Sequence, residues 1–72
     1  MAVHELRAEI PGTLALYHCE SGAHVEAGEP IAEIECMKTF FTLNAPEAGV
    51  VAFVLDLGAV VGQDEVIATI ST

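Results

Sequence analysis

The chain has 72 residues, of which 53% are hydrophobic and 18% charged, and this composition predicts one small folded domain over residues 1–72. Its two basic and eleven acidic residues give a formal net charge of -9, which argues against binding to a nucleic-acid backbone or an anionic membrane surface. No run approaches the roughly 18 apolar residues of a membrane helix. Residues 1–10 lack a signal-peptide pattern, so we expect a cytoplasmic protein with both cysteines as free thiols.

Short runs rich in valine, isoleucine and threonine, interrupted by glycine or proline, predict an all-β chain. No window keeps the i, i+3, i+4 apolar spacing of a helix over three turns. The predicted strands span residues 4–9, 13–19, 23–26, 30–36, 39–44, 49–56, 59–61 and 66–71. The glycines, which we expect in turns, are at positions 12, 22, 28, 49, 58 and 62.

The strand predicted over 30–36 has a clear alternation. Ala32, Ile34 and Cys36 fall on one face, and Glu33 and Glu35 fall on the other. A half-buried strand follows, with Cys36 as a small buried hydrophobe.

The next strand, over 39–44, begins with two adjacent aromatic residues. Phe40 and Phe41 must point to opposite faces of a strand. We therefore expect one of them in the core and the other exposed. In the strand over 49–56 and the residue after it, alternation places Val51, Phe53, Leu55 and Leu57 on one face.

The chain contains an internal repeat of half its length. "GAHVEAGEPIAEIE" (22–35) aligns with "GAVVGQDEVIATIS" (58–71) at an offset of 36, and seven positions coincide. "PGTLAL" (11–16) resembles "AGVVAF" (48–53) at an offset of 37. Two copies of four short strands, related by a pseudo-twofold axis, would each bury one face against the other.

Lys38 is the only lysine in the chain. It lies in "IAEIECMKTFFTL" (31–43), which is longer than the usual strand of 3–10 residues, so we expect a break at Met37-Lys38. The segment lacks Asn-Gly or Asp-Gly, the favoured hairpin residues. Because Lys38 lies at the junction of the two repeats, the pseudo-twofold predicts that the chain termini lie at the opposite end of the domain.

This pattern resembles the biotinyl (biotin carboxyl carrier) domain, a relative of lipoyl domains, over about residues 5–71. The family pattern of Glu, a small residue, Met-Lys-Met and then Ala-Pro-x-x-Gly is matched by Glu35, Met37 and Lys38, and by Ala45, Pro46 and Gly49. Two positions depart from it, because Cys36 replaces the small residue and Thr39 replaces the second methionine.

The resemblance implies a flattened β-barrel of two four-stranded sheets with quasi-twofold symmetry, and the modified lysine at a hairpin tip. It also implies that a biotin protein ligase attaches biotin to Lys38. The arm would then carry a carboxyl group from a biotin carboxylase to a carboxyltransferase, as in an acyl-CoA carboxylase such as acetyl-CoA carboxylase. Met37, Glu35 and Thr39 are the expected recognition residues for the ligase and partners. The domain itself would be a carrier without catalytic residues.

Two other functions stay open. A lipoyl carrier of a 2-oxo acid dehydrogenase or glycine-cleavage-like system would share the fold, although lipoyl domains typically have Asp-Lys-Ala at the tip. An unmodified interaction domain would keep the fold without the cofactor. We expect no metal site, because the spacing of the histidines and cysteines at 18, 19, 24 and 36 matches no zinc pattern.

Overall fold

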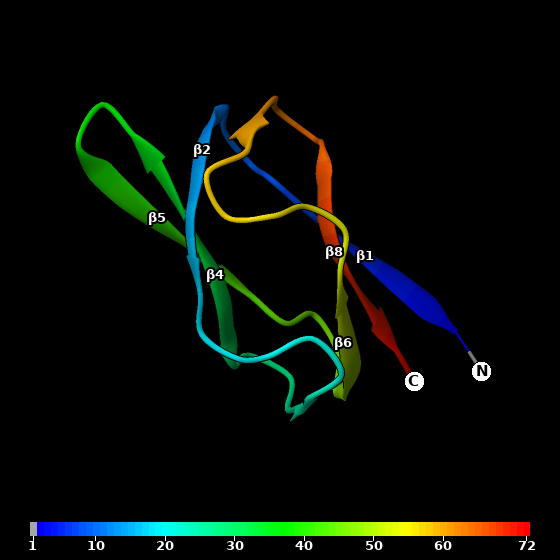
Figure 1. Ribbon diagram of the computed structural model, residues 1–72. Coiled ribbons are helices and arrows are strands. Elements are labelled where there is room, and N and C mark those ends of the chain that lie inside the picture. The colour runs from blue at the N-terminus through cyan, green and yellow to red at the C-terminus, as the bar shows by residue number, and fades with distance from the viewer. Residues whose placement is uncertain (1) are drawn as a thin grey trace.

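Eight strands form two four-stranded antiparallel sheets in the computed structural model, which describes residues 2–72 (Figure 1). The strands are β1 (Val3–Arg7), β2 (Gly12–Tyr17), β3 (His24–Val25), β4 (Pro30–Cys36), β5 (Thr39–Asn44), β6 (Gly49–Phe53), β7 (Val60–Val61) and β8 (Val66–Ser71). Their order is β1-β8-β6-β3 in one sheet and β5-β4-β2-β7 in the other. The predicted all-β architecture is confirmed. In the described part of the chain, no helix is long and apolar enough to cross a bilayer.

The two sheets are pseudo-twofold equivalents, as the repeat predicts. The strand order of one sheet matches that of the other position by position: β1 corresponds to β5, β8 to β4, β6 to β2 and β3 to β7. Backbone hydrogen bonds repeat in the same way. The amide of His18 donates to the carbonyl of Ile31 at 2.7 Å. In the equivalent hydrogen bond, the amide of Val54 donates to the carbonyl of Ile67 at 2.9 Å.

A β-bulge explains why the repeat has two offsets. In the β2–β4 pair, Leu14 lies opposite Ile34 and Leu16 lies opposite Glu33, so Ala15 is an extra residue in β2. The β6–β8 pair has no such insertion over the equivalent stretch. The offset between the two repeats is therefore 37 before the bulge and 36 after it.

The core is built from equivalent residues of the two repeats. The eight largest fully buried side chains form four pseudo-twofold pairs: Leu14 and Val51, Val25 and Val61, Ile31 and Ile67, Ile34 and Ile70. Burying each such side chain stabilises the fold by about 1.5–3 kcal/mol. Residues 2–72 bury no polar or charged side chain in this core. Each sheet combines strands of both repeats, since β1 and β3 pair with β8 and β6 and β4 and β2 pair with β5 and β7, so neither repeat could form this core alone.

Two of the six predicted turn glycines are instead strand residues in close contact with a neighbour. Gly22, Gly28 and Gly58 have the positive φ angles of turns, at 95°, 85° and 87°. Gly12 and Gly49 begin β2 and β6. A side chain at Gly12 would overlap the carbonyl oxygen of Glu35, and one at Gly49 would overlap the equivalent oxygen of Ser71.

The strand predicted over 49–56 is shorter than expected. It ends at Phe53, because the amides of Val54 and Leu55 turn toward the carbonyl of Ile67 as the chain leaves the sheet. The alternation therefore does not continue to Leu57, which is 57% exposed.

Candidate functional site

Met37 and Lys38 form the two-residue loop of the β4–β5 hairpin, where the sequence predicts a break. Cys36 and Thr39 are the last paired residues before it. Met37 has a φ of 52° and Lys38 a φ of 65°. Positive φ at both central residues is the signature of a type I′ turn, whose twist matches that of the flanking strands. The turn therefore forms without the Asn or Gly that usually accommodates this backbone, and such departures cluster at functional sites.

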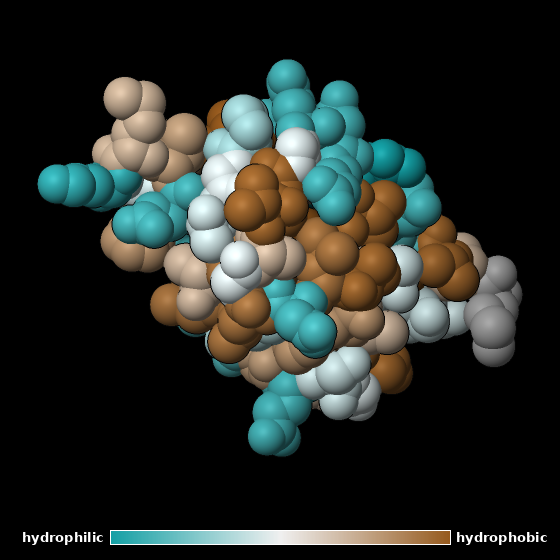
Figure 2. All heavy atoms as spheres, turned by 45° about the horizontal axis from the view of Figure 1, so that its top comes forward, coloured by the Kyte–Doolittle hydropathy of each residue, from teal (hydrophilic) through white to brown (hydrophobic). Residues whose placement is uncertain are grey.

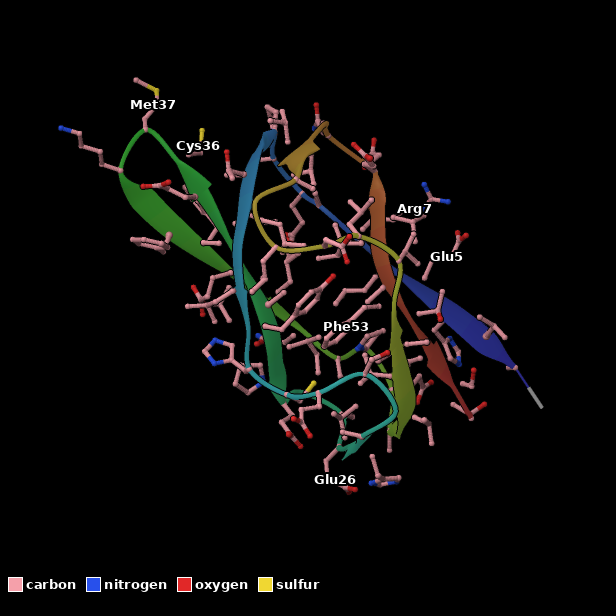
Figure 3. All side chains as sticks on the ribbon, viewed as in Figure 1. Glu5, Arg7, Glu26, Cys36, Met37 and Phe53 are labelled. Atoms are coloured by element: carbon pink, nitrogen blue, oxygen red, sulfur yellow. The ribbon has the colours of Figure 1, made fainter. Side chains whose placement is uncertain are left out.

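The hairpin tip is fully open to solvent. Met37 is 92% exposed, and Figure 3 shows it as an outermost point of the molecule. Lys38 is also exposed, and its ammonium group makes no ion pair with any residue between positions 2 and 72. The Lys38 amine is therefore accessible to an enzyme that would modify it.

The tip and the chain ends lie at opposite ends of the molecule (Figure 1). The Cα atoms span 36 × 18 × 18 Å. At the end opposite the tip, the amide of Thr72 donates to the carbonyl of Ala2 at 2.9 Å. Cys36 is equivalent to Thr72 at the offset of 36. The pseudo-twofold therefore relates the hairpin tip, which follows Cys36, to the opposite end of the molecule, where Thr72 lies beside Ala2. This arrangement confirms the placement that the repeat predicts.

Both phenylalanines beside the tip are exposed, so the expectation that one of them enters the core is wrong. Phe40 is 57% exposed and Phe41 is 43% exposed. β5 is an edge strand that pairs only with β4, and its first residues extend beyond the sandwich with the tip. The core first reaches this strand at Leu43, which is buried.

Glu35 and Thr39 lie on the flanks of the tip. Glu35 is half-buried and pairs with Phe40, while Thr39 is exposed. Cys36 is half-buried, less enclosed than the buried hydrophobe that its alternation with Ile34 predicts. The reason is that Cys36 is the last residue of β4 and lies at the open end of the hairpin.

A hydrogen-bonded cluster on the outer face of the same sheet was not apparent in the sequence. Nε2 of His18 lies 2.7 Å from Oε2 of Glu33, and the hydroxyl of Thr42 donates to the same oxygen at 2.9 Å. These hydrogen bonds, with a smaller contribution from the nearby His18 charge, lower the pKa of Glu33. Only the register of β4 against β5 brings Glu33 and Thr42 together.

The histidines and cysteines considered for a metal site do not converge. Among residues 2–72, no three His, Cys, Asp or Glu side chains are placed to hold a metal ion. His24 instead lies with its Nδ1 3.3 Å from Oε2 of Glu26. Burial raises the pKa of the Cys19 thiol, and the nearby Glu29 raises it further. Cys19 is therefore a poorly reactive thiol, since the thiolate is the reactive form.

Comparison with known proteins places this geometry in a family. The pattern of the biotin/lipoyl family, described as "Biotin-requiring enzyme", matches residues 4–70. Acetyl-CoA carboxylase of Dictyostelium discoideum is 42% identical over 65 residues, which is 90% of this chain and 3% of that protein. The chain thus corresponds to a small fraction of the length of this relative.

Two solved structures have the same fold. The crystal structure of Kluyveromyces lactis urea carboxylase matches with a TM-score of 0.90 and 29% identity, over 99% of this chain and 6% of that one. The lipoyl domain of the 2-oxoglutarate dehydrogenase complex from Azotobacter vinelandii matches with a TM-score of 0.72 and 30% identity, over 86% of this chain and 80% of that one. The chain belongs to the biotin/lipoyl family of biotin-requiring enzymes.

Proposed function

We propose that residues 1–72 form a biotin carrier domain in which biotin is attached through an amide bond to Nζ of Lys38. The observation that carries this proposal is the placement of the chain's single lysine. Lys38 is an exposed residue of a type I′ turn, at the end of a 36 Å long molecule opposite its termini. The family match over residues 4–70 supports biotin as the group.

The residues at the tip fit a covalently attached arm. The Lys38 amine has no competing carboxylate within the described residues, so a ligase can approach it without breaking an ion pair. Met37, at 92% exposure, gives that ligase an apolar recognition point, with Glu35 and Thr39 at the sides. The two-residue turn holds the backbone of Lys38 at a defined place, because the hairpin's hydrogen bonds fix both ends of the turn, while the lysine side chain extends from it into solvent.

When bound, biotin would supply the group that carries a carboxyl unit between a biotin carboxylase and a carboxyltransferase. The domain itself positions the arm. A rigid body with its termini at one end and its arm at the other raises the effective concentration of the arm at two separate sites. The domain contributes no catalytic residue in this proposal. Cys19 and Cys36 are free thiols, the state that a reducing cytoplasm maintains.

Relatives of this chain give the proposal its context. Similarity to an acetyl-CoA carboxylase and to a urea carboxylase supports a place within a biotin-dependent carboxylase. The acceptor of the carboxyl group would be chosen by the carboxyltransferase, which is a separate part of such an enzyme.

A lipoyl carrier is the second candidate, because the Azotobacter lipoyl domain shares the fold over 80% of its length. The two candidates are separated by incubating the purified chain with a biotin ligase, biotin and ATP, and in parallel with a lipoate ligase, lipoate and ATP. We expect incorporation of biotin, detected by avidin binding, and little incorporation of lipoate. Preferential incorporation of lipoate would reverse the assignment.

A further inference from the structure

A groove of about 360 Å³ lies away from the tip, where the two repeats face each other. Its walls are the segments 16–21 and 53–57, which are largely pseudo-twofold equivalents of one another. Tyr17 corresponds to Phe53, and Glu20 corresponds to Asp56. We call this feature the twofold groove. Figure 3 shows Phe53 in the middle of the molecule and Met37 at its far end, so the groove and the tip are separate surfaces.

Tyr17 and Phe53 form the aromatic floor of the twofold groove. The rings of Tyr17 and Phe53 stack with centroids 3.5 Å apart and an interplanar angle of 4°. The Tyr17 hydroxyl lies 2.6 Å from the carbonyl oxygen of Leu55 and 3.1 Å from that of Ile67, which fixes the ring in place. An aromatic floor with few polar groups is typical of preformed binding sites.

The walls of the twofold groove leave apolar side chains exposed. Leu16 is 37% exposed and Leu57 is 57% exposed, one from each of the two segments that line the groove. In Figure 2, hydrophobic atoms gather over the middle of the visible face, with hydrophilic residues around them. The exposed leucines that line the groove therefore favour a ligand that presents an apolar group to it.

The charged residues of the twofold groove are all acidic. Glu20 and Asp56 line it, and no lysine or arginine among residues 2–72 does. Arg7 is held elsewhere, by the side chain of Glu5 and the carbonyl of Asp64 at 2.7 Å, and Lys38 lies at the tip. Burial raises the pKa of Tyr17, and the Asp56 carboxylate raises it further. The charge complement of the groove is a cation.

We propose that the twofold groove binds a segment of a protein partner in which a leucine- or methionine-sized side chain is flanked by arginine or lysine. The apolar side chain covers the Tyr17–Phe53 floor, and the basic side chains approach Glu20 and Asp56. A partner held here leaves the tip free, so the domain can be docked while its arm reaches an active site. This inference goes beyond the carrier function and requires no biotin on Lys38.

The probe is the peptide acetyl-Ser-Arg-Leu-Leu-Arg-Ser-amide, titrated into the ¹⁵N-labelled 72-residue chain and followed by amide chemical shifts. We expect saturable shifts at Tyr17, Glu20 and Phe53, and no comparable shifts at Met37. A second peptide, with glutamine in place of both arginines, is expected to bind more weakly. The double variant Glu20→Gln/Asp56→Asn should weaken binding of the first peptide about fivefold, the product of two exposed charge pairs.

The matched control is Glu9→Gln/Glu47→Gln, which changes the net charge equally at exposed residues outside the groove. It should leave the affinity nearly unchanged. Equal weakening by both double variants, or shifts spread over the whole acidic surface, would show attraction by net charge alone and overturn the proposal. The absence of saturable shifts would overturn it too. Groove shifts that depend on protein concentration without peptide would assign the groove to a second copy of the chain.

Discussion

Tyr17 and Phe53 lie face to face across the pseudo-twofold axis, with ring centroids 3.5 Å apart and an interplanar angle of 4°. Aromatic pairs prefer offset or edge-to-face arrangements to such close parallel stacking. The geometry follows instead from the two repeats, which place equivalent residues at the same point of opposite sheets. The Tyr17 hydroxyl donates to the carbonyl of Leu55, so the Tyr17 ring is anchored to the backbone just after Phe53.

Replacing Tyr17 by Phe tests that anchor. Tyr17→Phe should lower the free energy of unfolding by about 1 kcal/mol, because the Leu55 carbonyl loses its 2.6 Å partner while the stacked rings remain. Chemical denaturation followed by circular dichroism measures the change. Tyr17→Leu removes the ring as well and should cost more. Equal losses in the two variants would mean that the stacking contributes nothing.

The close approach at Gly12 predicts a large effect from one methyl group. Gly12→Ala and Gly49→Ala should each destabilise the fold by about 3 kcal/mol, because a Cβ atom would overlap the carbonyl of Glu35 or Ser71. The two losses should be similar, since the contacts are pseudo-twofold equivalents. In Gly62→Ala the new Cβ would meet its nearest atom at 3.8 Å, and we expect no loss there. If Gly62→Ala lowers the denaturation midpoint as much as Gly12→Ala and Gly49→Ala do, the close backbone contacts at Gly12 and Gly49 are not the cause of the loss.

The turn at Met37 predicts opposite effects on stability and on modification. Met37→Asn should raise the free energy of unfolding by about 0.5 kcal/mol, because Asn tolerates the φ of 52° and the 92% exposed methionine has little burial to lose. The same variant should slow biotinylation, since the proposed ligase contact is removed. Met37→Leu, which keeps an apolar side chain, is the control. Unchanged biotinylation of Met37→Asn would remove Met37 from the recognition residues.

The lowered pKa of Glu33 predicts a pH dependence. The Glu33 carboxylate is stabilised in the folded state and so contributes to the free energy of unfolding. This contribution is fully present above the ordinary glutamate pKa of about 4.3, and it is lost as the pH falls through the lower pKa of the folded state. Thr42→Val removes the hydrogen bond at 2.9 Å and should raise the pKa of Glu33 in a carboxyl ¹³C titration. Thr13→Val, on the neighbouring strand, should not. A Glu33 pKa that does not respond to Thr42→Val would exclude this hydrogen bond as a cause.

Hydrophobic patterning was sufficient to predict an all-β chain and most of its strands, whereas the two four-stranded sheets were implied by the resemblance to the biotinyl family. Each strand is short and bounded by turn residues, and the alternation around Ile34 correctly separates buried Ala32 and Ile34 from Glu33 and Glu35, although it fails at Cys36, which is only half-buried. The repeat correctly indicated the symmetry and the placement of Lys38 opposite the termini. Both are consequences of local periodicity and of internal similarity, which a single sequence displays.

The incorrect predictions arose where a neighbouring strand decides the outcome. Phe41 has the alternation of a core residue, but no strand of the other sheet covers it at the open end of β5. Gly12 appeared to be a turn residue because its contact with Glu35 depends on sheet register. The cluster of Glu33 with Thr42 and the groove around Tyr17 also require the paired sheets, and no short motif marks either.

The central claim is that Lys38 carries the cofactor, and trypsin tests it directly. Arg7 and Lys38 are the only residues after which trypsin cleaves in this chain. After co-expression with a biotin ligase, the intact mass should rise by one biotinyl group, and digestion should leave residues 8–72 as a single biotinylated fragment. Lys38→Arg should keep the fold and show no added mass. A biotinylated Lys38→Arg chain, or cleavage after Lys38 in a chain that carries biotin, would contradict the assignment.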